Sequence, residues 1–324
     1  MRRALFLYNP ISGRRRQRRL RDVTAAAEVF RRAGVEATIE ATAGPGTAPE
    51  QARAAADAGY DALIVCGGDG SIHEAIQPLV HTAIAVGILP LGTGNGLAND
   101  LGIPRDPVGA AEMLLQSEPR PLRLPRMEFQ NPIKRISDAS RYCLIGAGIG
   151  PDAQLAYRMT LAFKQRWGMT AYYAEAWRQW LTYSFPLFEI EFLDNGRVRR
   201  ERVTQVLAIR IEWFGGFLRR LAPGASLLRD DLRLVLVKSR RRWPYIRYVT
   251  GLQFGKAWVG NDIELVSTTE FTCRALEGSG RIFAEADGEL LSTLPVTVKM
   301  TDATVNLLVP TNAKLPRIFT ERHG

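Results

Sequence analysis

Three short glycine-rich segments hold the residues that could do chemistry in this sequence. They read NPISG at 9–13, GGDGS at 67–71 and GTGN at 92–95, and each follows an apolar run. Glycine allows a positive φ and lets a ligand approach the backbone amides closely. Successive N–H groups, together with the N-terminus of a helix that begins near Ser71, form a concave site for anions. One GGDG alone could be a tight turn whose aspartate caps the next helix, but three such segments predict a polyphosphate site.

The elements expected around these segments would bring them together. Over the first 120 residues, segments of helical periodicity alternate with strand-like runs, which read ALFLYN, VEATIEA, DALIVC and AIAVGILPL. This alternation predicts a parallel sheet covered by helices, with ligands bound at the carboxyl ends of the strands. Each glycine-rich segment follows a strand of this sheet, so we expect all three at the same edge.

The second half of the chain has a different character. Strand-like runs dominate after about residue 122, Asn195-Gly196 is typical of a hairpin tip, and helices are expected only after Asp152 and across 170–181. We therefore expect an α/β + β fold, in which a parallel-sheet α/β domain precedes a mostly antiparallel, β-sandwich-like domain and the active site lies in the cleft between them. The predicted first domain is 1–122 plus a returning tail at about 308–324, and the second is 123–307.

Length, charge and cysteine content narrow the class of protein. A chain of 324 residues exceeds the size at which single cores stop growing, which fits two domains. The net charge of +10 favours an anionic partner: a nucleotide, a nucleic acid or the surface of an acidic membrane. Three distant cysteines give neither a disulfide framework nor a zinc site, and no run reaches about 18 apolar residues, so we expect a cytoplasmic protein without a membrane span. The absence of a P-loop motif and of G-x-G-x-x-G at the first helix disfavours P-loop and dinucleotide-binding enzymes.

Taken together, the motifs resemble a known family. GGDGSIHE, with NPISG upstream, PLGTGN downstream and AEADGE at 284–289, is similar to the catalytic domain of diacylglycerol kinases, a superfamily that includes bacterial lipid kinases and sphingosine kinases. The resemblance covers nearly the whole chain. NAD kinases also carry GGDG, but the other motifs in this order favour the lipid kinases. The resemblance implies transfer of the γ-phosphate of ATP, with Mg²⁺, to a primary hydroxyl of a lipid. Diacylglycerol is the expected acceptor, and a sphingoid base is the alternative.

The resemblance also implies roles for individual residues. Asp69 would act on the Mg²⁺, and Asp287 would accept the proton of the lipid hydroxyl with support from Glu289. Asp152 would contact the acceptor. The ATP phosphates would rest on Asn9, Ser12, Gly13, Gly67, Gly68, Gly70, Ser71, Gly92, Thr93, Gly94 and Asn95.

A structural Mg²⁺ is implied at Asp230, with carbonyl oxygens of Leu227 and Leu232 as further ligands. Each acidic residue outside the glycine-rich segments also has a simpler interpretation. Asp287-Gly288 could be only a hairpin tip, Asp152 only a helix cap, and the segment around Asp230 only a surface turn.

Two positions depart from the family pattern and bear on the acceptor. Bacterial members carry an aspartate where this chain has Gly96, whereas sphingosine kinases carry a small residue there and share the H-E dipeptide at 73–74. Against a sphingoid base, an acidic residue that those kinases place one helical turn after Asp152 is Ala156 here. Asp100 is a carboxylate that could replace the one missing at Gly96. We expect His73 to be a packed or solvated side chain and not a catalytic one.

Three segments that mix arginine with aromatic residues predict contact with a membrane surface. They are RVRRER at 197–202, EWFGGFLRR at 212–220 and SRRRWPYIRY at 239–248. Rings suit the head-group level and cations suit anionic phospholipid, although the same aromatics could belong to the core of the β domain. Such surfaces also bind single-stranded nucleic acid, but that function would leave the ordered motifs unexplained, so no nucleic-acid partner is expected. A non-catalytic protein that binds nucleotide or lipid is the remaining alternative, and a homodimer is left open.

Overall fold

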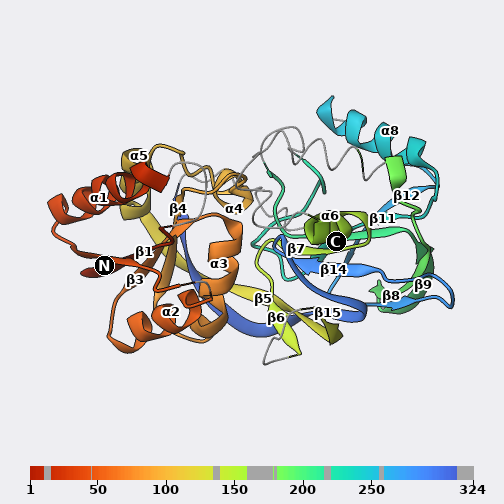
Figure 1. Ribbon diagram of the computed structural model, residues 1–324, viewed down its shortest axis with the longest axis horizontal. Helices are drawn as coiled ribbons and strands as arrows, with labels where there is room; N and C mark the ends of the chain where they lie inside the picture. The colour runs from red at the N-terminus through yellow and green to blue at the C-terminus, as the bar shows by residue number, and fades with distance from the viewer. Residues whose placement is uncertain are drawn as a thin grey trace, which may run out of the picture.

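The computed structural model describes residues 1–10, 16–44, 46–133, 139–158, 178, 181–214, 220–254 and 259–311, and Figure 1 shows two halves joined by long strands. Ser12, Gly13 and most of the helix expected at 170–181 lie outside the described residues.

The first half forms the expected parallel sheet covered by helices. Its strands follow the order β15-β4-β3-β1-β2 and pair in parallel. They are β1 (Arg3–Tyr8), β2 (Glu36–Ala41), β3 (Ala62–Gly67), β4 (Ala85–Pro90) and the last part of β15 (Glu289–Pro310). Every residue of β3 and β4 is buried, which explains their continuous apolar sequence.

Helices lie on both faces of this sheet. Figure 1 shows α1 (Arg16–Arg32) and α5 (Pro107–Leu115) together on one side, and α2 (Ala48–Asp57) and α3 (Asp69–Ile76) on the other. A 3₁₀ turn, η1 (Gln77–Leu79), continues α3, and the short α4 (Gly96–Asp100) follows the third glycine-rich segment.

The second half is the expected, mostly antiparallel β-sandwich-like domain. One path runs β12-β11-β10-β7-β14-β15, while β13 pairs with β15 and β8, and β8 pairs with β9. The strands are β5 (Ser117–Pro132), β6 (Ser140–Tyr142), β7 (Gly146–Ile149), β8 (Phe188–Asp194), β9 (Arg197–Val203), β10 (Gln205–Ile209), β11 (Leu232–Val237), β12 (Ile263–Thr268), β13 (Glu270–Ala275) and β14 (Phe283–Ala286). Phe188, Phe192 and Phe271 are buried in its core.

Two long strands connect the halves. β5 pairs with β15 antiparallel from Pro310↔Ser117 to Ser292↔Pro132, with register shifts that let both strands bend. Strand β15 is continuous from Glu289 to Pro310, and β5 runs without a break through residue 122. The end of β15 returns to the first sheet beside β4, at Asn306↔Ala85 and Leu307↔Val86.

Three elements of the second half lie outside the predicted strands and helices: β12, β14 and the helix α8 (Arg242–Gln253). The α8 sequence is rich in aromatic and β-branched residues, which have low helix propensity. Packing overrides this preference, because Tyr248 is 1% exposed and its hydroxyl donates to the Leu221 carbonyl at 2.7 Å.

The predicted hairpin at Asn195-Gly196 is confirmed. Both residues have positive φ, 50° and 77°, as a two-residue turn between antiparallel strands requires, and β8 and β9 pair on either side of it. Within the described residues, no helix is both long and apolar enough to cross a membrane.

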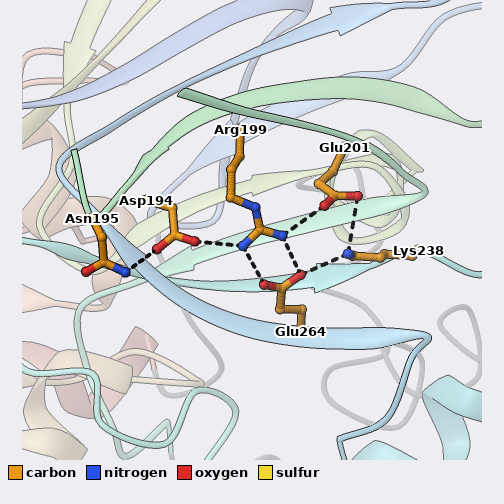
Figure 2. A network of polar contacts seen from close by, with 6 residues as sticks. All are labelled: Asp194, Asn195, Arg199, Glu201, Lys238 and Glu264. Carbon is orange, nitrogen blue, oxygen red and sulfur yellow. Dashed lines mark hydrogen bonds and ion pairs between the residues drawn. The ribbon is translucent and has the colours of Figure 1, made fainter. Parts of the chain in front are cut away.

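An ion network ties this hairpin to β11 and β12 (Figure 2). Arg199 contacts Asp194 at 2.7 Å, Glu201 at 2.9 Å and Glu264 at 2.9 Å, and Lys238 bridges the last two carboxylates. These hydrogen bonds to Arg199 hold the pKa of both Glu201 and Glu264 below their usual range. In the segment 197–202, which was predicted to contact a membrane, Arg199 is therefore paired with carboxylates of the protein itself.

Candidate active site

The second and third glycine-rich segments pack against each other. The carbonyl of Gly67, at the end of β3, accepts hydrogen bonds from the N–H groups of Leu91 at 3.0 Å and Gly92 at 3.2 Å. A Cβ placed on Gly92 would lie 2.5 Å from the Cα of Gly68. Because that neighbour is backbone, any larger residue at position 92 would force the two turns apart. Parallel pairing of β3 with β4 brings both turns to the expected edge of the sheet.

Asn95 and Arg19 shape the third turn. Asn95 is 3% exposed and left-handed (φ 57°), and its side chain accepts from the Gly92 N–H at 3.0 Å and donates to the Gly92 carbonyl at 2.9 Å. Buried Arg19 donates to the carbonyls of Asn9 at 3.1 Å and Leu91 at 3.0 Å, thereby linking the first and third segments. No sequence pattern indicated a role for Arg19, because its partners lie after two different strands.

The other residues predicted to bind phosphate fall into two groups. Gly70 and Ser71 lie in the first turn of α3, whereas Thr93 and Gly94 are exposed at the tip of the third turn.

Asp69, the first residue of α3, is held by the start of α4. One carboxylate oxygen accepts from the Gly96 N–H at 2.9 Å and the other from the Leu97 N–H at 3.2 Å. Burial raises the pKa of Asp69, these N–H groups lower it, and the charge of Asp287 raises it further. The charge of Asp287 therefore acts on Asp69, so the two predicted catalytic carboxylates influence each other.

The carboxylates near α3 fit a Mg²⁺ that arrives with a nucleotide. Each oxygen of Asp69 uses one lone pair in the hydrogen bonds above and keeps another. Glu289 reaches the same turn, since a Cβ on Gly70 would lie 2.8 Å from its Oε1. Among the residues that the structure describes, no cluster of three or more His, Cys, Asp or Glu could hold a metal alone. This suits Mg²⁺, which is usually bound by one or two carboxylates together with substrate phosphates.

Asp287 is both a hairpin tip and a buried polar centre. It has φ 51° and connects β14 to β15 through Gly288 (φ 82°), so the turn interpretation holds for the backbone. The side chain, however, is 1% exposed. The residue therefore does more than shape a turn.

Four hydrogen bonds converge on the Asp287 carboxylate. The N–H groups of Ile145 and Gly146 donate to Oδ1 at 2.8 and 2.9 Å, and that of Leu144 donates to Oδ2 at 2.8 Å. The fourth contact is to Nδ1 of His73, 3.0 Å from Oδ2. A carboxylate has about four lone-pair sites, so all of them are used here.

His73 is thus a site residue that the sequence analysis undervalued. It is packed and not solvated, and it lies one helical turn after Asp69 on α3. Its hydrogen-bond partner, Asp287, is 214 residues away in the chain, so no local sequence pattern predicts the contact.

Asp100 does not replace the carboxylate missing at Gly96. Its Oδ1 accepts from the N–H groups of Glu212 and Trp213, both at 2.9 Å, so it anchors the second half of the chain to α4. Burial raises the pKa of Asp100 to about 6. A Cβ on Gly96 would meet Ile211 at 3.3 Å and Phe214 at 3.6 Å, which leaves a larger residue at 96 little room.

Asp152 lies in the first turn of α6 (Pro151–Arg158), and its carboxyl group meets that of Glu285 on β14. Glu285 belongs to the AEADGE motif but was not predicted as a site residue.

The residues predicted to hold a structural Mg²⁺ do not fit one. The Leu227 carbonyl accepts a hydrogen bond from Nη2 of Arg210 at 3.0 Å, and the Arg229 carbonyl accepts a longer one from the same atom at 3.4 Å. Asp230 instead pairs with Arg123 at 3.4 Å on the surface, and Leu232 pairs with Thr268 in the sheet. Arg210 is 0% exposed, and burial lowers its pKa to about 10. A guanidinium therefore occupies the place of the expected cation.

Comparison with known proteins agrees with this architecture. Residues 3–127 match the family model of the diacylglycerol kinase catalytic domain, and residues 145–309 match that of the YegS C-terminal NAD kinase beta sandwich-like domain. The chain is 29% identical over 253 residues to a diacylglycerol kinase of Bacillus subtilis, covering 77% of this chain and 78% of that protein. It is 27% identical over 239 residues to a diacylglycerol kinase of Staphylococcus haemolyticus, covering 73% and 67%.

Solved structures share the whole fold. A crystal structure from Bacillus anthracis str. Sterne has a TM-score of 0.76 at 20% identity, over 96% of each chain. Another, of a diacylglycerol kinase from the same strain, has a TM-score of 0.67 at 19% identity, over 96% of this chain and 98% of that one.

Proposed function

Because this chain belongs to the diacylglycerol kinase family of lipid kinases, we propose that it transfers the γ-phosphate of ATP to a primary hydroxyl of a membrane lipid. The observation that carries the proposal is the convergence of Asp69, Glu289 and the His73–Asp287 pair beside the glycine turns. Phosphoryl transfer depends mainly on positioning and on neutralising the phosphoryl oxygens. Glycine amides, a few acidic residues and a metal suffice for that chemistry.

The glycine turns would bind the nucleotide. Gly68 and Gly92 let the two turns pack closely together. Because α3 begins immediately after Gly68, its first N–H groups would face the phosphates. Asp69 and Glu289 would hold the Mg²⁺ together with the phosphates. When bound, this ion supplies the positive charge that neutralises the transferring group.

Asp287, oriented by His73, would receive the proton of the lipid hydroxyl. All its lone pairs are in use, so one hydrogen bond must yield during transfer. The three N–H donors belong to one stretch of backbone, whereas His73 is a side chain that can turn away. We therefore assign the yielding bond to His73.

Two acceptors compete for the role of substrate. The curated relatives are diacylglycerol kinases, and the small residue at Gly96 with the H-E dipeptide at 73–74 favours a sphingoid base. In mixed micelles of diacylglycerol, monoacylglycerol and sphingosine with labelled ATP, we expect one lipid to become labelled. ATP binding without any lipid product would instead support a non-catalytic nucleotide-binding protein.

Peripheral contact with the inner face of a cytoplasmic membrane would bring the enzyme to its lipid. Around the start of α8, Arg240, Arg241 and Trp243 are exposed, with Trp243 at 69%, and Figure 1 places this helix at the outer edge of the second half. An interfacial tryptophan flanked by cations suits anionic phospholipid. This part of 239–248 replaces 197–202 as the proposed docking surface.

Sedimentation with vesicles tests this surface. Wild-type protein should bind phosphatidylglycerol vesicles at low salt and release as salt rises, and Trp243→Ala should weaken binding by about tenfold, or ~1.4 kcal/mol, because one interfacial anchor is lost. Val198→Ala removes a similarly exposed apolar residue from the hairpin and serves as the control. Equal binding of neutral and anionic vesicles would contradict the proposal.

A further inference from the structure

Asp152, which is half-buried, and Glu285, which is buried, form a pair of carboxyl groups at the hairpin that carries Asp287. A Cβ placed on Gly148 would lie 2.1 Å from Oδ2 of Asp152 and 2.6 Å from Oε1 of Glu285, so both groups cover the same glycine. A hydrogen bond between the two carboxyls contributes to the pKa of each. Such a bond requires a shared proton, and at position 148 only glycine leaves room for the pair.

The pair carries negative charge without a protein cation. Burial raises the pKa of Asp152 to about 6 and raises that of Glu285 well above its usual range, with the charge of Asp152 adding to the latter rise. Within the described part of the chain, neither carboxyl forms an ion pair with lysine or arginine. Besides its contact with Asp152, Glu285 accepts from the Gly288 N–H at 2.6 Å. Buried carboxylates are normally paired or bound to a ligand.

An unpaired oxygen of Gln205 is a second, independent indication that a ligand binds here. Gln205 is 1% exposed, and its Nε2 donates to Oδ1 of Asp152 at 3.3 Å. Its Oε1 is buried and has no hydrogen-bond partner among the described residues, and the same holds for the Tyr183 hydroxyl. Burial, and then the charge of Asp152, raise the pKa of Tyr183 to about 12. Unpaired buried polar atoms are rare and costly.

The missing group is a donor with positive charge. The two carboxyls and the Gln205 oxygen are acceptors, and an ammonium group brings three N–H donors and one charge. Diacylglycerol brings a single hydroxyl donor and ester oxygens that cannot donate. We propose that Asp152, Glu285 and Gln205 bind the protonated amine of a lipid amino alcohol. This inference rests on the proposed function, because it names the class of acceptor.

The placement also suits transfer to the neighbouring hydroxyl. Glu285 precedes Asp287 by two residues on one hairpin, and its Oε2 is bonded to the turn itself. In a 2-amino-1-alcohol the amine and the hydroxyl are carried on adjacent carbons. One small head group can therefore reach the acidic pair with its amine and Asp287 with its hydroxyl.

Calorimetric binding without ATP tests the site directly. The probes are a 2-amino-1-alcohol with an eight-carbon chain, its N-acetyl derivative and ethanolamine. Wild-type protein should bind the amine at least tenfold more tightly than the N-acetyl derivative, and Glu285→Gln should reduce this ratio below threefold. Glu277→Gln, which removes an exposed carboxylate on the connection before β14, should keep the wild-type ratio. If Glu285→Gln does not fold, Gln205→Met is the second variant: it removes the unpaired Oε1 of Gln205 and keeps a side chain of similar volume.

The outcomes separate the two proposals. Equal affinity for the amine and its N-acetyl derivative, or ethanolamine binding as tightly as the lipid amine, would overturn the lipid-amine site. Selective amine binding in a protein that phosphorylates no lipid would leave the site standing and refute the kinase proposal. A kinase whose kcat/KM for diacylglycerol exceeds that for the long-chain amino alcohol would retain its proposed function and refute this inference.

Discussion

Replacing Asp287 by asparagine should lower kcat for lipid phosphorylation by about 10²–10⁴-fold, the range that general acid–base catalysis contributes. His73→Asn should instead stay within about tenfold of wild type, or ~1.4 kcal/mol in the barrier. An asparagine at 73 can still donate to Oδ2 of Asp287, as Nδ1 of His73 does at 3.0 Å. His73→Leu cannot donate and should fall between the two variants.

The asparagine at 287 has a structural effect that must be measured separately. Its amide nitrogen would face the N–H of Leu144 or those of Ile145 and Gly146, which now donate to the carboxylate. Each buried N–H left without an acceptor costs about 1–3 kcal/mol. Thermal unfolding and ATP affinity should therefore accompany the kinetics, and a variant that still binds ATP reports on the proton transfer itself.

Comparison of the two asparagine variants assigns the proton acceptor. If His73→Asn is folded and as inactive as Asp287→Asn, the imidazole takes the proton and Asp287 only holds the ring. If Asp287→Asn keeps more than a tenth of the activity, the residue is chiefly a hairpin tip. Intact activity in His73→Asn alone supports Asp287 as the base.

Local patterns predicted most of the fold because the relevant signals lie within single elements. The buried strands β3 and β4 are continuous apolar runs, and the glycine turns follow them directly. Parallel pairing then brings the turns together without further information. The same logic failed at α8, where a buried Tyr248 stabilises a helix that its composition does not favour.

The site was harder to predict because its polar contacts join distant segments. His73 and Asp287 are 214 residues apart, and Arg19 reaches Leu91 across 72. Glu285 lay within a recognised motif, yet only the fold shows that its side chain meets Asp152 over Gly148. Residue type and spacing identify which residues can do chemistry, whereas the pairing of strands and helices decides which of them meet.

Arg210→Ala should make the stability of this protein depend on divalent cations. In wild type the guanidinium donates to the Leu227 and Arg229 carbonyls, and the charges of Asp287, Asp230 and Asp231 favour its ionised form. Removing one partner of buried charges costs on the order of 3–5 kcal/mol. The variant should lose that much stability in urea unfolding, and millimolar Mg²⁺ or Ca²⁺ should restore part of it, since carbonyl and carboxylate oxygens prefer these ions.

Wild-type protein supplies the first comparison. Without nucleotide, its unfolding midpoint should not respond to Mg²⁺ or EDTA, because the guanidinium already satisfies the carbonyls. Arg200→Ala provides a matched control: Arg200 is exposed, pairs only with Glu191 among the described residues, and should cost less than about 1 kcal/mol with no response to metal.

Two results would contradict this account of Arg210. A wild-type midpoint that rises with Mg²⁺ in the absence of nucleotide would mean that a metal binds beside the arginine, so that the two cations coexist. An Arg210→Ala variant that loses stability but ignores every divalent ion would mean that the loop cannot form a cation site. Partial recovery in the variant alone would establish that the fixed charge of Arg210 takes the place of the expected metal ion. Nε and Nη1 of Arg210 lack hydrogen-bond partners among the described residues. The charges of the nearby aspartates offset the cost of leaving these two groups unpaired.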